Sequence, residues 1–299
     1  MNHSPTGGTL GLIAAGLGST EILDPICAEV TRFSESRGYT LFRGETSAGD
    51  IDSEDFTIEQ ADVLAARYID RGVQGVYFAP LEMPKDHLAV NRQIATKLRA
   101  AGIAVVLLDR DIEEFGSRGS CDLVGIDSFA AGFTLGVHLA ETGRRRIRFF
   151  AMPHYPSTAN LRSAGLFAAL RQARLRQEFT DIIAGDPTDL KLVRRMLDIH
   201  YPDAIVCAND RTAAVLMQTL SSLGMAVPQS IAIAGFDDIR YVTLLSVPLT
   251  TMQQPCRDIG LGAVNLMAER LNTPSLPSRT LSYSANLVVR ASTSSKISK

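Results

Sequence analysis

The chain has 299 residues, of which 45% are hydrophobic and 21% are charged, and its formal net charge is −2. This length suits two α/β lobes better than one small core, and the composition is that of an ordinary soluble globular protein. The nearly balanced charge excludes a general attraction to nucleic acid or to an anionic membrane.

The first part of the chain alternates between short apolar runs and longer amphipathic segments. In the second of these segments, Ile22, Ile26, Val30 and Phe33 recur at nearly helical spacing. The predicted elements are strand Thr9–Ala15, helix Thr20–Arg37, strand Tyr39–Phe42, helix Ile58–Arg71, strand Gln74–Ala79, helix Lys85–Ala101 and strand Ala104–Leu108. Short strands that alternate with such helices predict a parallel sheet covered on both faces.

The same alternation begins again after Gly143. The predicted elements are strand Ile147–Ala151, helix Thr158–Ala173, strand Phe179–Ala184, helix Thr188–Ile199, strand Asp203–Ala208, helix Asp210–Leu223, strand Ile231–Gly235, helix Cys256–Leu271, and two strands near Arg279–Ser282 and Asn286–Arg290. We therefore expect an α/β fold with two doubly wound parallel-sheet lobes. A ligand would bind in a crevice at the carboxyl ends of the strands.

Motifs of common enzymes are absent or incomplete. Gly16-Leu-Gly18 starts a dinucleotide fingerprint, but its third glycine is replaced by Glu21, which would repel a pyrophosphate. The sequence contains no phosphate-binding Gly-x-x-x-x-Gly-Lys-Ser/Thr loop and no Gly-x-Ser-x-Gly elbow. Its five histidines lack metal-site spacing. We expect no enzyme, no cofactor and no metal site.

Polar side chains follow apolar runs at three places between Asn209 and Pro255. These are Asn209-Asp210, Gly235-Phe236-Asp237-Asp238 and Leu249-Thr250-Thr251-Met252-Gln253-Gln254. Asp237 and Asp238 could form a general acid/base pair, but adjacent residues that leave a strand point in different directions. We therefore expect one of them to face a cleft and the other to start a helix.

Cysteine usage and the N-terminal sequence indicate the compartment. The four cysteines contain no Cys-x-x-Cys pair, and Cys207 lies within an apolar run, as a buried free thiol would. The first eight residues have neither the basic nor the apolar region of a signal peptide, and no apolar run reaches membrane-spanning length. These features predict a soluble cytoplasmic protein that does not contact a membrane.

Seven segments, taken in order, resemble the sensor half of lactose-repressor (LacI) family transcription regulators. The similarity covers about Thr9 to Thr293 and is strong from Ile103 onward. It rests on Val105–Arg110, Asp127–Gly132, Ala159–Gly165, Ala208–Ala213, Val227–Asp238, Pro248–Pro255 and Leu287–Thr293. The resemblance implies the type I fold of periplasmic sugar-binding proteins, in which a hinge joins the two lobes.

The resemblance also implies that the chain crosses three times between the lobes. The crossings would fall near Glu141–Arg145, Gln253–Cys256 and Ser282–Ala285. The N-terminal lobe would then contain residues 9–142 and 256–281. The C-terminal lobe would contain residues 144–253 and 284–293.

Eight positions match the family's ligand-binding residues. Asp109 and Arg110 match a strand-end pair that binds sugar hydroxyls in relatives. Arg162 matches an arginine that reaches ligand oxygens, and a guanidinium can bond two adjacent hydroxyls of a vicinal diol. Thr158, one helical turn earlier, matches a hydroxyl contact. Asp127 matches an acid that opens a helix, and capping that helix is as good an interpretation as ligand contact.

The remaining three positions, Asn209, Asp237 and Gln254, match an amide, a carboxylate and an amide that complete the ligand cage. Such a set donates and accepts hydrogen bonds, as a polyol requires. Asp210 and Asp238 are instead interpreted as helix-start acids near the helix macrodipole.

The sequence departs from the family pattern in two respects. Where sugar-binding relatives often place aromatic residues, this chain has Ser19–Leu23, so Phe129 could supply the stacking platform instead. Glu21 and Glu82 could even select a cationic or amino-bearing ligand. The family's helix-turn-helix headpiece is also missing, because the first strand begins at about Thr9.

The function expected from the resemblance is effector sensing. A small sugar or sugar derivative would bind between the lobes of a homodimer and change its affinity for operator DNA, which the full-length protein contacts through the headpiece absent from this chain. The alternative is a solute-binding receptor for an ABC sugar transporter, which would be monomeric and exported. An enzyme on a doubly wound fold is a third hypothesis, for which no catalytic constellation was found.

Overall fold

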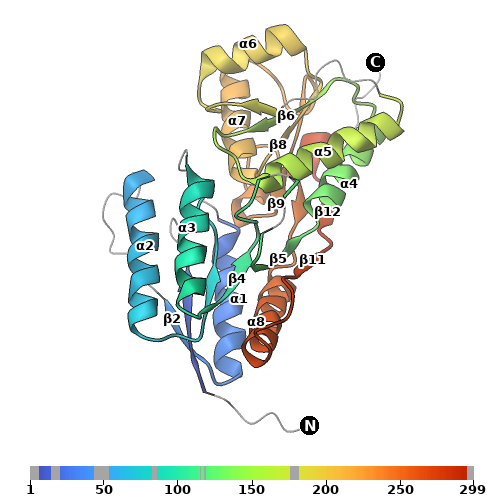
Figure 1. Ribbon diagram of the computed structural model, residues 1–299. Coiled ribbons are helices and arrows are strands. Elements are labelled where there is room, and N and C mark those ends of the chain that lie inside the picture. Colours follow the sequence, from blue (N-terminus) through green and yellow to red (C-terminus); the bar gives the residue numbers. More distant parts are fainter. Residues whose placement is uncertain are drawn as a thin grey trace. The chain divides into compact units, whose positions relative to one another are not determined.

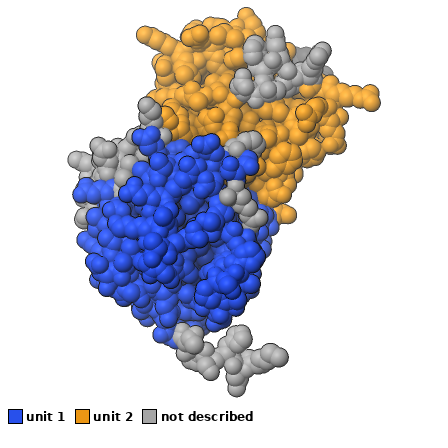
Figure 2. Space-filling model, in the orientation of Figure 1, with its two compact units in different colours: residues 1–126, 255–283 blue, residues 127–254, 284–299 orange. Residues whose placement is uncertain are grey.

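The chain forms two compact units, which Figure 2 colours separately. The computed structural model describes residues 7–14, 21–43, 54–82, 86–114, 116–117, 119–175 and 182–294, leaving aside the side chains of residues 54–58. Unit 1 comprises Met1–Ile126 and Pro255–Tyr283. Unit 2 comprises Asp127–Gln254 and Ser284–Lys299. Each unit is described by itself below.

Unit 1 is built on a six-stranded parallel sheet with the order β11-β5-β4-β3-β1-β2. Its strands are β1 Thr9–Ile13, β2 Thr40–Arg43, β3 Gly75–Phe78, β4 Ala104–Leu108, β5 Asp122–Ile126 and β11 Thr280–Tyr283. Its helices are α1 Leu23–Ser36, α2 Glu54–Asp70, α3 His87–Ala100 and α8 Cys256–Asn272. In Figure 1, α1 packs beside α8 and α2 packs beside α3.

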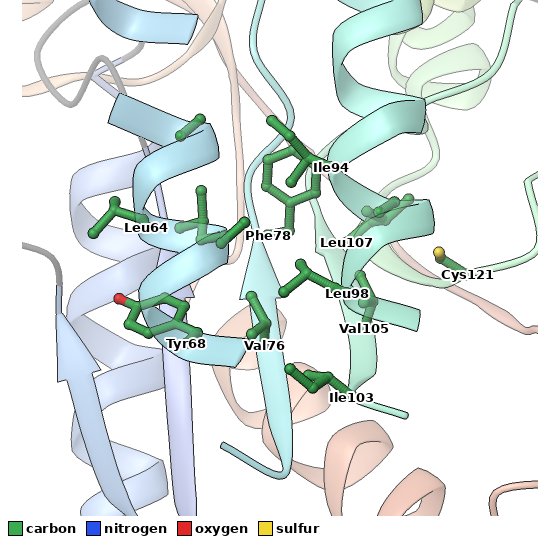
Figure 3. Packing of buried hydrophobic residues seen from close by; sticks show 14 of the residues in the cluster. Leu64, Tyr68, Val76, Phe78, Ile94, Leu98, Ile103, Val105, Leu107 and Cys121 are labelled. Carbon is green, nitrogen blue, oxygen red and sulfur yellow. The ribbon is translucent and has the colours of Figure 1, made fainter. Parts of the chain in front are cut away.

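One hydrophobic cluster of unit 1 lies between the sheet and the helix pair α2 and α3. Figure 3 shows Leu64 and Tyr68 of α2 facing Val76 of β3, with Leu98 of α3 opposite. The Tyr68 hydroxyl lies 2.9 Å from the carbonyl oxygens of both Leu12 and Phe42, so this buried aromatic side chain also satisfies its polar atom.

Unit 2 repeats the arrangement with a six-stranded sheet of order β12-β10-β9-β8-β6-β7. Its strands are β6 Ile147–Ala151, β7 Ile182–Ala184, β8 Ala204–Cys207, β9 Ala232–Asp237, β10 Thr250–Gln253 and β12 Asn286–Val288. Its helices are α4 Ser128–Glu141, α5 Ser157–Gln172, α6 Leu190–His200 and α7 Asp210–Ser222, with short 3-10 turns at Arg240–Thr243 and Ala291–Thr293. All pairings are parallel except β10 with β12.

The first five strands of each unit occur in the same order. If the strands of each unit are numbered by their order in the chain, both sheets have the strand order 2-1-3-4-5. Strands β4 and β9 are the fourth strands and therefore hold equivalent places. In this doubly wound order ligands bind outside the carboxyl ends of the strands. The predicted fold class, two doubly wound parallel-sheet lobes, is confirmed.

The first crossing between the lobes was predicted in the wrong place. The sequence assigned residues 128–142 to the N-terminal lobe, whereas the structure places α4 in unit 2 and the boundary after Ile126. The reason is close packing of α4 on α5. A Cβ atom at Gly132 would lie 1.9 Å from the Arg162 carbonyl oxygen, and one at Gly165 would lie 2.0 Å from the Phe129 carbonyl oxygen.

Some expectations differ from the structure or fall outside the described residues. Strands β5 and β10 were not predicted, and the strand expected at Phe179–Ala184 is described only over Ile182–Ala184. Gly16-Leu-Gly18 and the start of the Ser19–Leu23 window lie outside the described part of the chain.

Candidate functional site

Three of the predicted ligand-binding residues come together in unit 2, at the carboxyl ends of its strands. Gln253 of β10 lies opposite Asp237 of β9, so Gln254 emerges beside the Asp237 side chain. The Gln254 Nε2 atom donates a hydrogen bond to Asp237 Oδ1 at 2.8 Å, and both residues are buried. The sheet register therefore brings this amide and this carboxylate into contact.

Arg162 reaches the same carboxylate from α5. Its Nη2 atom lies 3.7 Å from Asp237 Oδ1, and its Nη1 atom donates to the Ala208 carbonyl oxygen at 2.6 Å. The guanidinium carbon lies 4.6 Å from the centroid of the buried Phe236 ring, a cation–π contact that fixes the plane of the group. Within the described part of the protein, Arg162 Nε is buried without a hydrogen-bond partner.

Thr158 and Asn209 flank this cluster on the two neighbouring helices. Thr158 is buried one turn before Arg162 on α5, and therefore lies on the same helix face. Asn209 caps α7, since its Oδ1 atom accepts a hydrogen bond from the Thr212 N–H group at 2.8 Å. Cap formation uses the amide oxygen and leaves the amide NH₂ group as a donor.

Asp109 and Arg110 lie together in unit 1, after β4. Asp109 Oδ2 accepts hydrogen bonds from Arg110 Nε at 3.2 Å and Nη2 at 2.9 Å, and Arg110 Nη1 donates to Glu82 at 2.7 Å. Burial lowers the pKa of Arg110, but the Glu82 and Asp109 carboxylates outweigh burial and raise it above its ordinary value. Asp109 Oδ1 is buried without a partner among the described residues.

The acids Asp109 and Asp237 share an unusual backbone conformation. Asp109 has φ 71° and Asp237 has φ 113°, in the region that residues other than glycine seldom adopt. Such residues cluster at functional sites, because the surrounding structure must hold them there. Asp109 directly follows β4, and Asp237 is the last residue of β9. Each of these strands is the fourth of its sheet in chain order.

Asp127 caps α4 in unit 2. Its Oδ1 atom accepts a hydrogen bond from the Ala130 N–H group at 2.8 Å, and the residue is exposed. The capping interpretation therefore has direct support, while ligand contact stays a prediction. Phe129, expected as an alternative stacking platform, has 42% of its surface exposed on the same helix.

Asp210 is more than a helix-start acid, and Asp238 does not start a helix, because the next element is the 3-10 turn Arg240–Thr243 with Ile239 before it. Asp210 begins α7, but its buried carboxylate also accepts hydrogen bonds from Thr251 Oγ1 at 2.6 Å and from the Ile239 N–H group at 3.2 Å. Asp238 pairs with Arg290 at 2.6 Å and accepts from Gln253 Nε2 at 2.8 Å. The Phe236 contact with Arg162 was also not predicted, because its sequence signal is only one more apolar residue in a strand.

The described residues contain no group of three or more His, Cys, Asp or Glu side chains arranged to hold a metal ion. Within the same residues, none of the helices is both long and apolar enough to cross a membrane. The side chains of the two clusters can form hydrogen bonds to a polar molecule. Carboxylates, amides and a guanidinium supply the donors and acceptors.

A family model and two curated repressors are similar to this chain in sequence. The model of the periplasmic binding protein-like domain matches residues 137–293. The repressor PurR of Aliivibrio salmonicida is 27% identical over 293 residues, which cover 95% of this chain and 81% of that protein. The ribose operon repressor of Escherichia coli is 30% identical over 178 residues, which cover 58% of this chain and 54% of that protein.

The fold is also that of solved regulator structures. A LacI family transcriptional regulator from Enterococcus faecium, determined with bound ribose, has a TM-score of 0.73 and 20% sequence identity. The alignment covers 96% of this chain and 98% of that structure. At this identity the likeness shows the fold alone. The predicted resemblance to LacI-type repressors is confirmed, and because the family model matches more than half of its length, the chain belongs to the family of periplasmic binding protein-like domains.

Proposed function

We propose that this chain is the effector-binding part of a LacI-type transcriptional regulator and that its effector is a neutral sugar or a similar polyol. The observation that carries the proposal is the cluster of Arg162, Asp237 and Gln254 at the carboxyl ends of the unit 2 strands. The names of the relatives support it, since they are repressors and one of them serves a ribose operon.

The chemistry of the cluster suits hydroxyl groups. Each hydroxyl both donates and accepts a hydrogen bond, so its site needs acceptors as well as donors. Asp237 supplies an acceptor, and the Asn209 amide and Arg162 Nε supply donors. Thr158 contributes a hydroxyl of its own. We keep all eight predicted positions, Asp127 included, as the proposed contact set.

Charge favours a neutral effector over a phosphorylated one. Arg110 already pairs with two carboxylates, and Arg162 lies next to the carboxylate of Asp237. Neither guanidinium therefore carries an uncompensated positive charge for a phosphate dianion. We propose that sugar phosphates bind more weakly than the corresponding free sugars.

Regulation would follow from differential binding. An effector that binds one arrangement of the protein more tightly shifts the population toward it, whereas equal affinity would shift nothing. In this proposal the regulator is a cytoplasmic homodimer without enzymatic activity, and the full-length protein reaches operator DNA through a helix-turn-helix headpiece. A solute receptor of a transporter would use the same type of site as a monomer.

The proposal is tested by a thermal-shift screen followed by calorimetry. D-ribose, cellobiose, other pentoses and hexoses, nucleosides and ribose 5-phosphate are added to the purified chain, because a ligand of the folded state raises the melting temperature. Arg162→Ala should weaken binding of the best free sugar by roughly 10- to 150-fold, the equivalent of losing charged hydrogen bonds. Arg171→Ala, an exposed arginine on the same helix, is the matched control and should bind normally.

Two results would contradict the proposal. Equal affinity of the Arg162→Ala and Arg171→Ala variants would remove Arg162 from the site. Stabilisation by ribose 5-phosphate but by no free sugar would overturn the neutral effector. Light scattering addresses the alternative, since a monomer at all concentrations would favour the transport receptor.

A further inference from the structure

The turn that follows β9 is held in an uncommon backbone conformation. Asp237 and the next residue, Asp238, have φ values of 113° and 56°, so two consecutive residues with side chains lie in the left-handed region. Such a conformation persists only where the surrounding structure enforces it. Because Asp237 carries the carboxylate of the candidate site, whatever enforces this turn also sets the direction of that carboxylate.

The Asp238 side chain is held by Arg290 and Gln253, whereas the contacts of the two backbone N–H groups that follow Asp237 converge on Asp210. The N–H group of Ile239 donates to Asp210 Oδ2 at 3.2 Å. The N–H group of Asp238 lies 3.4 Å from Thr251 Oγ1, and this hydroxyl is 2.6 Å from Asp210 Oδ1. One carboxyl group therefore holds the backbone of the turn directly at Ile239 and through Thr251 at Asp238.

The strand next to Asp210 leaves room for this carboxyl group. A Cβ atom at Gly235 would lie 2.3 Å from Asp210 Oδ1, so a larger residue there would displace the acid. Asp210 itself is the first residue of α7 and has no exposed surface. The start of a helix is favourable for an acidic group, and this fixes the position from which the turn is held.

The surroundings of Asp210 favour its neutral form. Burial and the negative charge of nearby Asp237 raise the pKa of Asp210 well above its ordinary value. The Asp210 carboxyl group accepts hydrogen bonds from the Ile239 N–H group with one oxygen and from the Thr251 hydroxyl with the other. Asparagine has the same shape and is neutral; its amide oxygen can accept from the Ile239 N–H group and its NH₂ group can donate to the Thr251 oxygen, which supplies a conservative test of the interaction.

We infer that Asp210 is a positioning residue: through Ile239 and Thr251 it holds the Asp237–Ile239 turn in its left-handed conformation and thereby directs the Asp237 carboxylate toward Gln254 and Arg162. The effect on ligand affinity rests on the proposed function. The effect on the turn does not, because it depends only on contacts within unit 2.

The test compares four variants of the chain. Asp210→Ala and Thr251→Val remove the two groups that hold the turn, and Asp210→Asn can still contact both Ile239 and Thr251. Asp203→Ala is the control, since Asp203 is a buried acid at the opposite end of β8, where its carboxylate accepts from the N–H groups of Arg145 and Arg146. Crystal structures give the backbone of the turn, and calorimetry with D-ribose gives the affinity.

The expected results differ between Asp210, which holds the turn, and the control acid Asp203, which does not. Asp210→Ala and Thr251→Val lose the left-handed turn and the Asp237–Gln254 hydrogen bond, and they bind D-ribose roughly tenfold more weakly or worse. Asp210→Asn keeps both contacts and an affinity within about threefold of the parent chain. Asp203→Ala lowers thermal stability and leaves the turn and the affinity unchanged.

An intact turn in Asp210→Ala would overturn the inference, and so would parental affinity in that variant. If Asp210→Ala does not fold, Thr251→Val decides by the same two measurements. If the parent chain does not bind D-ribose, the proposed effector is wrong for that sugar, and the crystal structures alone decide whether Asp210 holds the turn.

Discussion

Asp109 in unit 1 and Asp237 in unit 2 hold equivalent places in the two sheets, yet they are used differently. Both lie at the end of the fourth strand with positive φ. Asp109 bonds to the adjacent Arg110, which also pairs with Glu82, so three charges form one network. Asp237 instead meets Gln254 of its own sheet and Arg162 of a helix. Equal strand order thus fixes where an acid lies, but not what it binds.

The cation comes from a different place in each unit. Arg162 lies on α5, the helix that follows the first strand of unit 2, whereas in unit 1 the cation is Arg110, the residue next to the acid. We expect the network of unit 1 to affect mainly stability and the cluster of unit 2 to affect mainly ligand affinity.

The largest expected effect tests the unit 1 network. Arg110→Ala leaves the carboxylates of Asp109 and Glu82 without their cation, and the side chains of all three residues are at most 18% exposed. Breaking a buried pair in this way lowers the free energy of unfolding by about 3–5 kcal/mol. Urea unfolding measures the change. Arg92→Ala, which breaks a more exposed pair with Glu113, should lose less than about 1 kcal/mol, and equal losses would refute the distinction.

A smaller loss of stability is expected from a substitution at the residue two places before Asp237, where the two units differ. This residue is Gly235, whose missing side chain admits the Asp210 carboxyl group, and its counterpart in unit 1 is Leu107. Gly235→Ala should lower the free energy of unfolding by about 1–3 kcal/mol, as overpacking does.

A double-mutant cycle identifies the cause of that loss. If the methyl group clashes with Asp210, Gly235→Ala should be less harmful in an Asp210→Ala background, by urea unfolding of all four proteins. Additive losses would instead place the strain elsewhere in unit 2.

Unit 2 contains a second buried acid near Asp237, Asp210, and this acid should make the stability of the protein depend on pH. Burial and Asp237 raise the pKa of Asp210, so the folded state holds this proton more tightly than the unfolded state. The stability that the proton contributes is complete below the ordinary pKa of 3.8 and is lost as the pH rises through the folded-state value. Asp210→Asn stays neutral, so its stability relative to the parent should increase in urea unfolding as the pH rises above 3.8, the ordinary pKa of the acid. Parallel curves would contradict a raised pKa.

The smallest expected effect concerns Asp127, which lies at the cap of α4 and is exposed. Asp127→Ala should lower the free energy of unfolding by about 1 kcal/mol, the usual contribution of a side-chain cap. Asp127→Asn retains a capping oxygen and should restore most of that stability. A loss of sugar affinity in both variants would show that Asp127 contacts the ligand in addition to capping the helix.

The sequence was sufficient to predict the fold class and the strands whose apolar runs have sharp ends. The strands Ala104–Leu108 and Ile147–Ala151 were predicted with the observed bounds. Strands β5 and β10 were missed because they contain buried polar residues, Asp122 and Thr250, whose hydrogen bonds come from distant segments. The membership of α4 was missed because it depends on glycine contacts between helices, which periodicity does not encode.

The candidate site was less predictable than the fold. Asp237 and Gln254 were noticed because they follow apolar runs, but their assignment as ligand contacts, and the inclusion of Arg162, came from the family resemblance, since no local spacing connects a helix residue with two strand ends. The role of Asp210 could not be inferred at all, because an acid that starts a helix is normally interpreted as a cap. Only its burial and its contacts with Thr251 and Ile239 reveal the second role.

The last part of the chain completes both units, and this constrains how the protein folds during synthesis. Residues 270–283 provide Arg270, the Arg279 N–H group and β11, all of which contact Asp122 or its strand in unit 1. The residues that follow provide β12, the Arg290 partner of Asp238, and Ser292 against Thr250 in unit 2. A nascent chain that stops at Gln254 therefore lacks the edge strands β11 and β12 and the cation that pairs with the buried Asp122. Until its final segment leaves the ribosome it is exposed to aggregation, and a shortened product would lose both units together.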